Sequence, residues 1–373
     1  MQSTQNPSAP IDHSAIHDRN SSVRPEPVEG LQGFDPSASS GQAKLSPNGV
    51  WEYGTVNSLL DHSLQLRWSL PALALLAALP LLASLAGDTF YVGLATRILI
   101  FALAATSLNL ILGFGGMVSF GHAAFVGVGA YTVAILMQSG VVSAWAAWPI
   151  AMLVSALFAL LIGWVSLRTQ GVYFIMITLA FAQMLYYLVV SLKAYGGDDG
   201  MSLAGRSSMG LGVNLGEDTH FYYVTLGLLV AAMLLITRLL NARFGHVLQA
   251  IRENEVRMTA IGFPVFRYKL VAFVLAGALA GLAGALLANQ GSFVSPALMQ
   301  WNQSGMLMIM VILGGVGHLY GGVLGAIVFL LLEEFLSHYT IHWQLGLGAV
   351  LLGVVLLAPN GLTSLLRRKG ASA

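Results

Sequence analysis

Apolar residues dominate the chain from about residue 69 onward, in long runs separated by short polar links. A helix needs about 20 apolar residues to cross the roughly 30 Å core of a bilayer. Windows of that size predict an all-α polytopic membrane protein of about ten spans, with eight as the lower count. These spans lie near residues 69–86, 90–113, 117–138, 145–167, 171–192, 220–240, 269–290, 303–316, 319–336 and 342–358. The glycine-rich segment Gly314–Gly322 separates the eighth and ninth spans, which would alternatively form one broken or re-entrant helix.

The first 66 residues differ in kind, because they are rich in Ser, Pro, Asn, Gln and Gly and have no sustained apolar period. Such a composition is typical of disorder. The stretch VRPEPVEG (Val23–Gly30) resembles peptides translated from bacterial palindromic repeat DNA, so a misplaced start codon is one explanation of this tail. We expect a membrane domain over residues 67–366 and a short polar tail over residues 367–373.

Composition indicates that lipid is the solvent of the membrane domain. Hydrophobic residues make up 56% of the 373 residues and charged residues 9%, against about 25% charged residues in soluble domains. The net charge of +1 does not indicate nucleic-acid binding. The chain has no cysteine, which excludes disulfides, thiolate metal sites and a cysteine nucleophile. We predict no metal site and no cofactor.

Basic residues predict the direction of the spans, since they are enriched in cytoplasmic links. With ten spans and a cytoplasmic N-terminus, one set of residues falls inside: Arg67, Arg168, Arg238, Arg243, Arg252, Arg257, Arg267, Lys269, Arg367, Arg368 and Lys369. The link Lys193–Thr219 falls outside and is the more acidic one. Both termini are therefore expected in the cytoplasm.

The link of residues 241–268 is the one long charged segment between spans on the predicted inner side. Val247, Ile251, Met258 and Ile261 recur at roughly helical spacing, which predicts a short amphipathic helix that ends at Gly262. Such a helix is suited to a groove on a partner protein. A solvated connector is the alternative interpretation.

Polar residues and glycines within the spans predict where the helices meet. Buried polar side chains avoid lipid, so one set is expected to line the interior and a translocation path: Asn109, Ser119, His122, Thr178 and Gln183. The spacing of Gly277 and Gly281 predicts a close helix contact. Arg97 is expected to snorkel or to pair with an acid such as Glu333 or Glu334.

Several segments resemble one family in the family's own order. They are GGMVSFGHAAFVGVGAYT (Gly115–Thr132), GVYFIMITLAFAQMLYYL (Gly171–Leu188), GGDDG (Gly196–Gly200) and GHVLQAIRENEVRMTAIGFPVFRYKLVAFVLAGALAGLAGAL (Gly245–Leu286). The chain resembles LivM-type permease subunits of bacterial branched-chain amino acid ABC transporters over roughly Leu70–Leu366. The resemblance implies a multi-pass permease of the bacterial inner membrane.

The resemblance also implies partners: two ABC ATPase subunits, a second related permease and a periplasmic substrate-binding protein. It assigns coupling to the ATPase to Arg252, Glu253, Asn254, Glu255 and Gly262. The chain has no Gly-Lys dipeptide and so no Walker A loop, which agrees with a non-enzymatic subunit driven by separate ATPases.

The outer link with Asp198 and Asp199 is expected to contact the binding protein, with a plain glycine-aspartate turn as the alternative. The spans carry few charges for a zwitterion, which favours a weak path served by that protein. An ion-coupled secondary transporter of a small polar solute is the alternative function. Its ion-carrying acids would have to be Glu333 and Glu334. No catalytic motif of a membrane enzyme occurs.

Overall fold

A computed structural model of the chain describes residues 44–45, 51–52, 74–80, 90–210, 214–339, 342–357 and 361–362. The chain divides into two units, Met1–Leu59 and Leu60–Ala373. In the first unit β1 (Lys44–Leu45) pairs with β2 (Trp51–Glu52) in antiparallel fashion. The composition did not predict this short pairing. The rest of the predicted tail 1–66 and the tail 367–373 lie outside the described residues.

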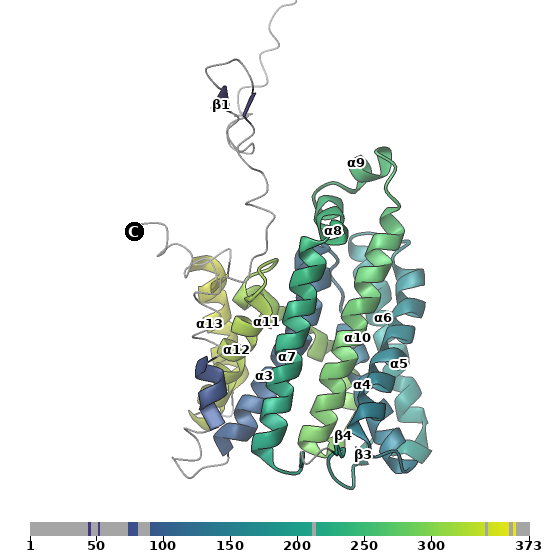
Figure 1. The fold of residues 1–373 in the computed structure, drawn as a ribbon, viewed down its shortest axis with the longest axis vertical. Helices are drawn as coiled ribbons and strands as arrows, with labels where there is room; N and C mark the ends of the chain where they lie inside the picture. The colour runs from purple at the N-terminus through teal and green to yellow at the C-terminus, as the bar shows by residue number, and fades with distance from the viewer. Residues whose placement is uncertain are drawn as a thin grey trace, which may run out of the picture. The chain divides into compact units, whose positions relative to one another are not determined.

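The second unit is built from helices, because backbone polar groups in lipid must be satisfied within the segment. Its long and short helices are α3 (Phe90–Asn109), α4 (His122–Gln138), α5 (Ala144–Ser166), α6 (Val172–Ser191), α7 (Asp218–Asn241), α8 (Arg243–Glu253), α9 (Glu255–Ala260), α10 (Val265–Gly291), α11 (Trp301–Gly314), α12 (Gly321–Tyr339) and α13 (Trp343–Leu357) (Figure 1). Single turns and short strands complete it: the π turn η1 (Leu110–Phe114), η2 (Lys193–Tyr195), η3 (Pro296–Met299), β3 (Met201–Ser202) and β4 (Phe293–Val294).

The described helices confirm an all-α polytopic membrane protein. Six of them are long and apolar enough to cross a bilayer, namely α3 with η1, α5, α6, α7, α10 and α12. Apolar helices of 10 to 17 residues form α4, α11 and part of α13. The predicted span near 69–86 is described only as helical residues 74–80. The count of ten spans therefore stays a prediction, whereas α11 and α12 are two separate helices and not one broken helix.

Glycines allow the central helices to approach closely, as their spacing predicted. A Cβ added at Gly281 of α10 would lie 3.1 Å from the Ala151 carbonyl oxygen of α5, and one at Gly284 would lie 3.0 Å from the Ala130 nitrogen of α4. Packing of this kind holds helices together where the hydrophobic effect is absent. α10 packs against both α4 and α5, and its glycines lie where these helices come closest.

Links between the helices gather at two opposite ends of the bundle (Figure 1). At the α8 end, the ring of Trp164 at the close of α5 lies 5.6 Å from that of Phe266 at the start of α10. Arg168, which follows α5, and Arg267, near the start of α10, therefore lie at the same end of the bundle. At the opposite, β3 end, β3 pairs with β4 and joins the loop after α6 to the end of α10.

Candidate functional site

Two short helices, α8 and α9, form the charged segment at the α8 end (Figure 1). The prediction of one continuous amphipathic helix is wrong, because Asn254 adopts an extended backbone between them, with φ −156° and ψ 98°. Its side-chain oxygen accepts a hydrogen bond from the Arg257 amide at 2.9 Å. Asparagine is a favoured N-cap, so it starts a new helix in the middle of the expected one.

The break divides the predicted apolar face. Ile251 and Met258 are buried with Val265 in a small cluster that rests on the start of α10. Ile261 was expected on the same face, yet it is 64% exposed, and Val256 is 80% exposed. The new helix phase after Asn254 turns these two apolar side chains away from the protein.

The five residues predicted for coupling occupy different environments. Arg252 is exposed overall, and its guanidinium donates a hydrogen bond to the Gly113 carbonyl in η1. Asn254 caps α9, and the Glu255 carboxylate pairs with the Lys269 ammonium at 2.5 Å. Glu253 is exposed, and Gly262 is exposed with φ +96°. The structure therefore brings these residues to one segment but engages three of them within the chain.

Exposed apolar side chains lie on α9 and directly after it, and of these only Ile261 belonged to the predicted apolar face. We define the α9 patch as Val256, Ile261 and Phe263, of which Phe263 is 36% exposed. Exposed Arg257 lies within the same stretch. The sequence does contain a pattern that predicts the break: Asn254 followed by the acidic Glu255 is typical of a helix start. Starting a second helix there would have changed the set of residues expected on one apolar face.

The predicted path residues are buried as expected, except for Gln183, which is half-buried. The His122 Nε2 lies 2.8 Å from the Ser107 hydroxyl, and its Nδ1 has no hydrogen-bond partner among the described residues. Ser119 accepts a hydrogen bond from the Gly121 amide at 3.2 Å. A Cβ at Gly121 would lie 2.6 Å from the Thr178 carbonyl oxygen, so Ser119, His122 and Thr178 surround one crossing of α4 and α6.

Asn109 belongs to a different place. Its side chain accepts from the Gly317 amide at 3.1 Å and donates to the His318 carbonyl at 2.8 Å, so it joins the end of α3 to the loop between α11 and α12. It does not contact the crossing of α4 and α6 through these bonds. The predicted path residues thus form two groups rather than one.

A small cavity lies where α3, α4, α10 and α11 meet. Its volume is about 20 Å³ and its lining is apolar apart from Gln303: Ile100, Phe101, Ala104, Ala123, Val126, Ala283, Leu287, Leu298, Gln303 and Leu307. This volume suits about one water molecule. The conformation described here is therefore closed to an amino acid at this point.

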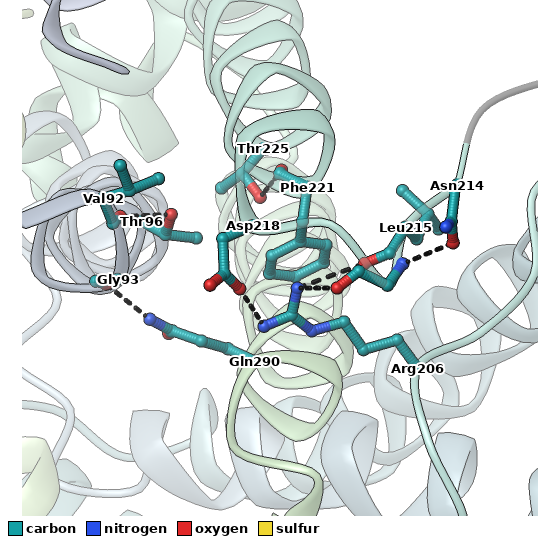
Figure 2. A network of polar contacts seen from close by, with 11 residues as sticks. Val92, Gly93, Thr96, Arg206, Asn214, Leu215, Asp218, Phe221, Thr225 and Gln290 are labelled. Atoms are coloured by element: carbon teal, nitrogen blue, oxygen red, sulfur yellow. Dashed lines mark hydrogen bonds and ion pairs between the residues drawn. The ribbon is translucent and has the colours of Figure 1, made fainter. Parts of the chain in front are cut away.

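The loop between α6 and α7 is tied down at the β3 end. Figure 2 shows the Arg206 guanidinium between the Asp218 carboxylate at 2.6 Å and the Leu215 carbonyl at 3.1 Å, with the Phe221 ring 4.9 Å away. Figure 2 also shows the Gln290 amide bonded to the Gly93 carbonyl at 2.8 Å.

Further bonds hold the same loop to α10 and α5. The Asn289 side-chain oxygen accepts from the Ser207 amide at 2.6 Å, and the Trp145 indole donates to the Met209 carbonyl at 2.9 Å. Asp198 and Asp199 lie exposed on this loop. The two carboxylates are therefore presented by a segment of well-defined shape.

Two further observations bear on the chemistry of the chain. Arg97 pairs with Glu333 at 3.2 Å, which confirms the predicted pairing and neutralises one of the two acids available to an ion carrier. Within the described residues, no three of His, Asp and Glu gather closely enough to hold a metal ion.

Comparisons with known proteins agree with this arrangement. The family model described as "Branched-chain amino acid transport system / permease component" matches residues 90–359. The chain is 29% identical over 300 residues to the high-affinity branched-chain amino acid transport system permease protein LivM of Salmonella typhimurium, covering 74% of this chain and 70% of that protein. LivM of Escherichia coli is 29% identical over 299 residues, with the same coverage.

A more distant relative is the autoinducer 2 import system permease protein LsrC of Klebsiella pneumoniae, 32% identical over 160 residues, which is 39% of this chain and 45% of that protein. No solved structure matches the chain. Since the family model spans most of the helical bundle, the chain belongs to the family of permease components of branched-chain amino acid transport systems.

Proposed function

We propose that the chain is the membrane subunit of an ATP-driven importer that moves branched-chain or similar amino acids into the cell across the bacterial inner membrane. The family match over residues 90–359 carries this proposal. Energy would come from two separate ATPase subunits, because the chain has no Walker A loop of its own. A second related permease would complete the pathway, and ten spans would place both termini in the cytoplasm.

The ATPase would dock on α8 and α9. Support comes from the α9 patch, because exposed apolar side chains on a charged segment outside the spans are typical of a protein interface. Glu253 and Gly262 border the patch and stay in the proposed surface. Arg252 and Asn254 are exposed as well, and together with Glu255 they would support the surface through their bonds within the chain.

The periplasmic binding protein would dock at the β3 end on Asp198 and Asp199. The cavity is too small to hold an amino acid. This supports a scheme in which the binding protein binds the substrate and the permease opens only transiently. The second candidate, an ion-coupled carrier, needs a free acid within the spans. Glu333 is paired with Arg97, so Glu334 would have to carry the ion, and the family match gives this candidate no support.

Charge introduced into the α9 patch tests the docking surface. The double variant Val256→Glu, Ile261→Glu should lower binding of the ATPase subunits by about 30-fold or more, because truncating an interface hot spot costs about 2 kcal/mol or more. Lys193→Glu is the matched control, since it makes the same change of two charge units at an exposed position of the opposite, β3 end. Equal binding of both variants would exclude this surface.

Reconstitution separates the two candidate functions. Purified chain alone in liposomes should not accumulate amino acids under a proton gradient, whereas liposomes that also hold the ATPases, the second permease and the binding protein should do so with ATP. Gradient-driven uptake by the chain alone would establish the carrier instead.

A further inference from the structure

Two links between helices at the α8 end of the bundle have irregular backbone, and we call them the two interruptions. After α3 the chain makes the π turn η1, closed by a bond of 2.9 Å from the Met117 amide to the Ile111 carbonyl, and then runs without regular structure to α4. Between α11 and α12 the chain forms a second irregular loop that includes Gly317, with φ +77°. Irregular backbone at membrane depth is tolerated where protein surrounds it.

The two interruptions contact each other. A Cβ added at Gly113 would lie 2.5 Å from the Gly317 nitrogen, so both positions need glycine. Asn109, only 1% exposed, bonds to the Gly317 amide and to the His318 carbonyl. The side-chain oxygen and nitrogen of Asn109 thus both bond to the loop after α11, and these two bonds hold that loop to the end of α3.

Arg252 links this junction to the docking segment. It projects from the last turn of α8, lies with its side-chain stem against Gly116, and donates to the Gly113 carbonyl. A Cβ at Gly116, where φ is +67°, would come within 2.9 Å of the arginine Cγ. A Cβ at Gly317 would lie 3.0 Å from the guanidinium Nη1. One side chain of α8 therefore rests on both interruptions.

The junction also bears on the closed cavity. Ala104, Ala123 and Leu307, which line that cavity, belong to α3, α4 and α11, the helices that end or begin at the two interruptions. Separation of α3 from α11 would widen the cavity on the side that these two helices line. The Asn109 bonds and the Arg252 contact oppose that separation from the α8 end.

We infer that Arg252 and Asn109 form a latch, in which Arg252 is the positioning residue that transmits movement of the ATPase-bound α8 to the helices around the cavity. With α8 in the present position the latch holds α3 and α11 together. When α8 moves away, the guanidinium leaves Gly113 and the interruptions separate. This inference rests on the proposed function for the source of the movement, but the latch itself is a property of the chain alone.

The test exploits the absence of native cysteine. Ala123→Cys places a thiol on the cavity, where the native side chain is 1% exposed. In purified full-length chain, Arg252→Ala should raise the rate of modification of this thiol by N-ethylmaleimide about tenfold, the order expected for loss of one hydrogen bond to a charged group. Arg243→Ala, at the other end of the same helix, is the matched control and should leave the rate unchanged.

The complete transporter adds a second readout. Arg252→Ala should lower uptake about tenfold while ATPase binding stays within about twofold, because the residue transmits movement and does not dock. Arg252→Lys keeps a donor and should restore part of the uptake. Asn109→Asp, which loses the bond to the His318 carbonyl, should raise thiol modification as well and serves if Arg252→Ala does not fold.

Thiol modification and uptake that match those of Arg243→Ala would overturn the latch. A reduced ATPase affinity of Arg252→Ala with unchanged thiol modification would also overturn it, since Arg252 would then be a docking residue. Failure of the ATPase subunits to bind the wild-type chain would contradict the proposed function. The latch would still be tested independently, by the thiol modification rates of the isolated chain.

Discussion

The two ends of the helical bundle are built in opposite ways. At the β3 end, the loop between α6 and α7 is bonded to three helices through Arg206, Ser207 and Met209. At the α8 end, α8 and α9 bury a cluster of three residues and leave the α9 patch exposed. The loop at the first end is held by bonds within the chain, whereas the segment at the second end leaves apolar side chains exposed. Substitutions should therefore affect stability at one end and coupling at the other.

The largest effect on stability is expected for Arg206→Leu at the β3 end. This change removes the ion pair with Asp218, the bond to the Leu215 carbonyl and the contact with Phe221. Asp218 is about half exposed, so solvent screens part of the pair. We expect a loss of about 2–3 kcal/mol, measured as a lower unfolding temperature in detergent. Lys193→Ala, on the same loop and exposed, should be neutral; similar shifts for both variants would contradict the comparison.

Asn289→Leu should have the next largest effect. Asn289 is fully buried and its loss leaves the Ser207 amide without its acceptor. An unsatisfied buried donor costs about 1–3 kcal/mol, and the expected result is a clear fall in unfolding temperature. Asn302→Ala, at an exposed position in the first turn of α11, is the control and should unfold at the wild-type temperature.

Asn254→Ala should act locally at the α8 end. It removes the cap of α9, which is worth about 1 kcal/mol. Amide hydrogen exchange in residues 255–260 should accelerate about fivefold, with the unfolding temperature unchanged. Unaltered exchange there would mean that α9 is held by packing rather than by its cap.

The smallest effect on stability is expected for Val256→Ser in the α9 patch. The side chain is 80% exposed, so the free energy of unfolding should change by no more than about 0.5 kcal/mol. ATPase binding should weaken nonetheless. A large loss of stability without loss of binding would reverse the assignment of the two ends.

Much of the bundle could be predicted from the sequence because lipid imposes simple rules. Run length located the described spans from α3 to α12, and glycine spacing located the face of α10 that meets α4 and α5. The need to bury polar groups identified Asn109, Ser119, His122 and Thr178 as interior residues. Each of these inferences depends on local composition, which a single chain displays directly.

The site was harder to predict because it depends on direction and pairing. Arg252 was expected to face a partner, yet it bonds to Gly113, which lies 139 positions away in the sequence. Ile261 was expected on the same helix face as Ile251 and Met258, but Asn254 starts a new helix between them, so that Ile251 and Met258 are buried and Ile261 is exposed. The spacing of apolar residues does not indicate which of two neighbouring charged side chains, Arg252 or Glu253, bonds within the chain.

The sequence alone determined the solvent of this protein, the approximate extent of its spans, the helix faces that pack and the absence of an ATP-binding loop, because hydropathy and glycine spacing act over a few turns of helix. Only the tertiary structure decided that the interruptions after α3 and α11 meet, that Asn109 and Arg252 join them, and that Val256 and Ile261 face outward. These outcomes depend on contacts between segments far apart in the chain, whose hydrogen bonds form only once the helices have packed.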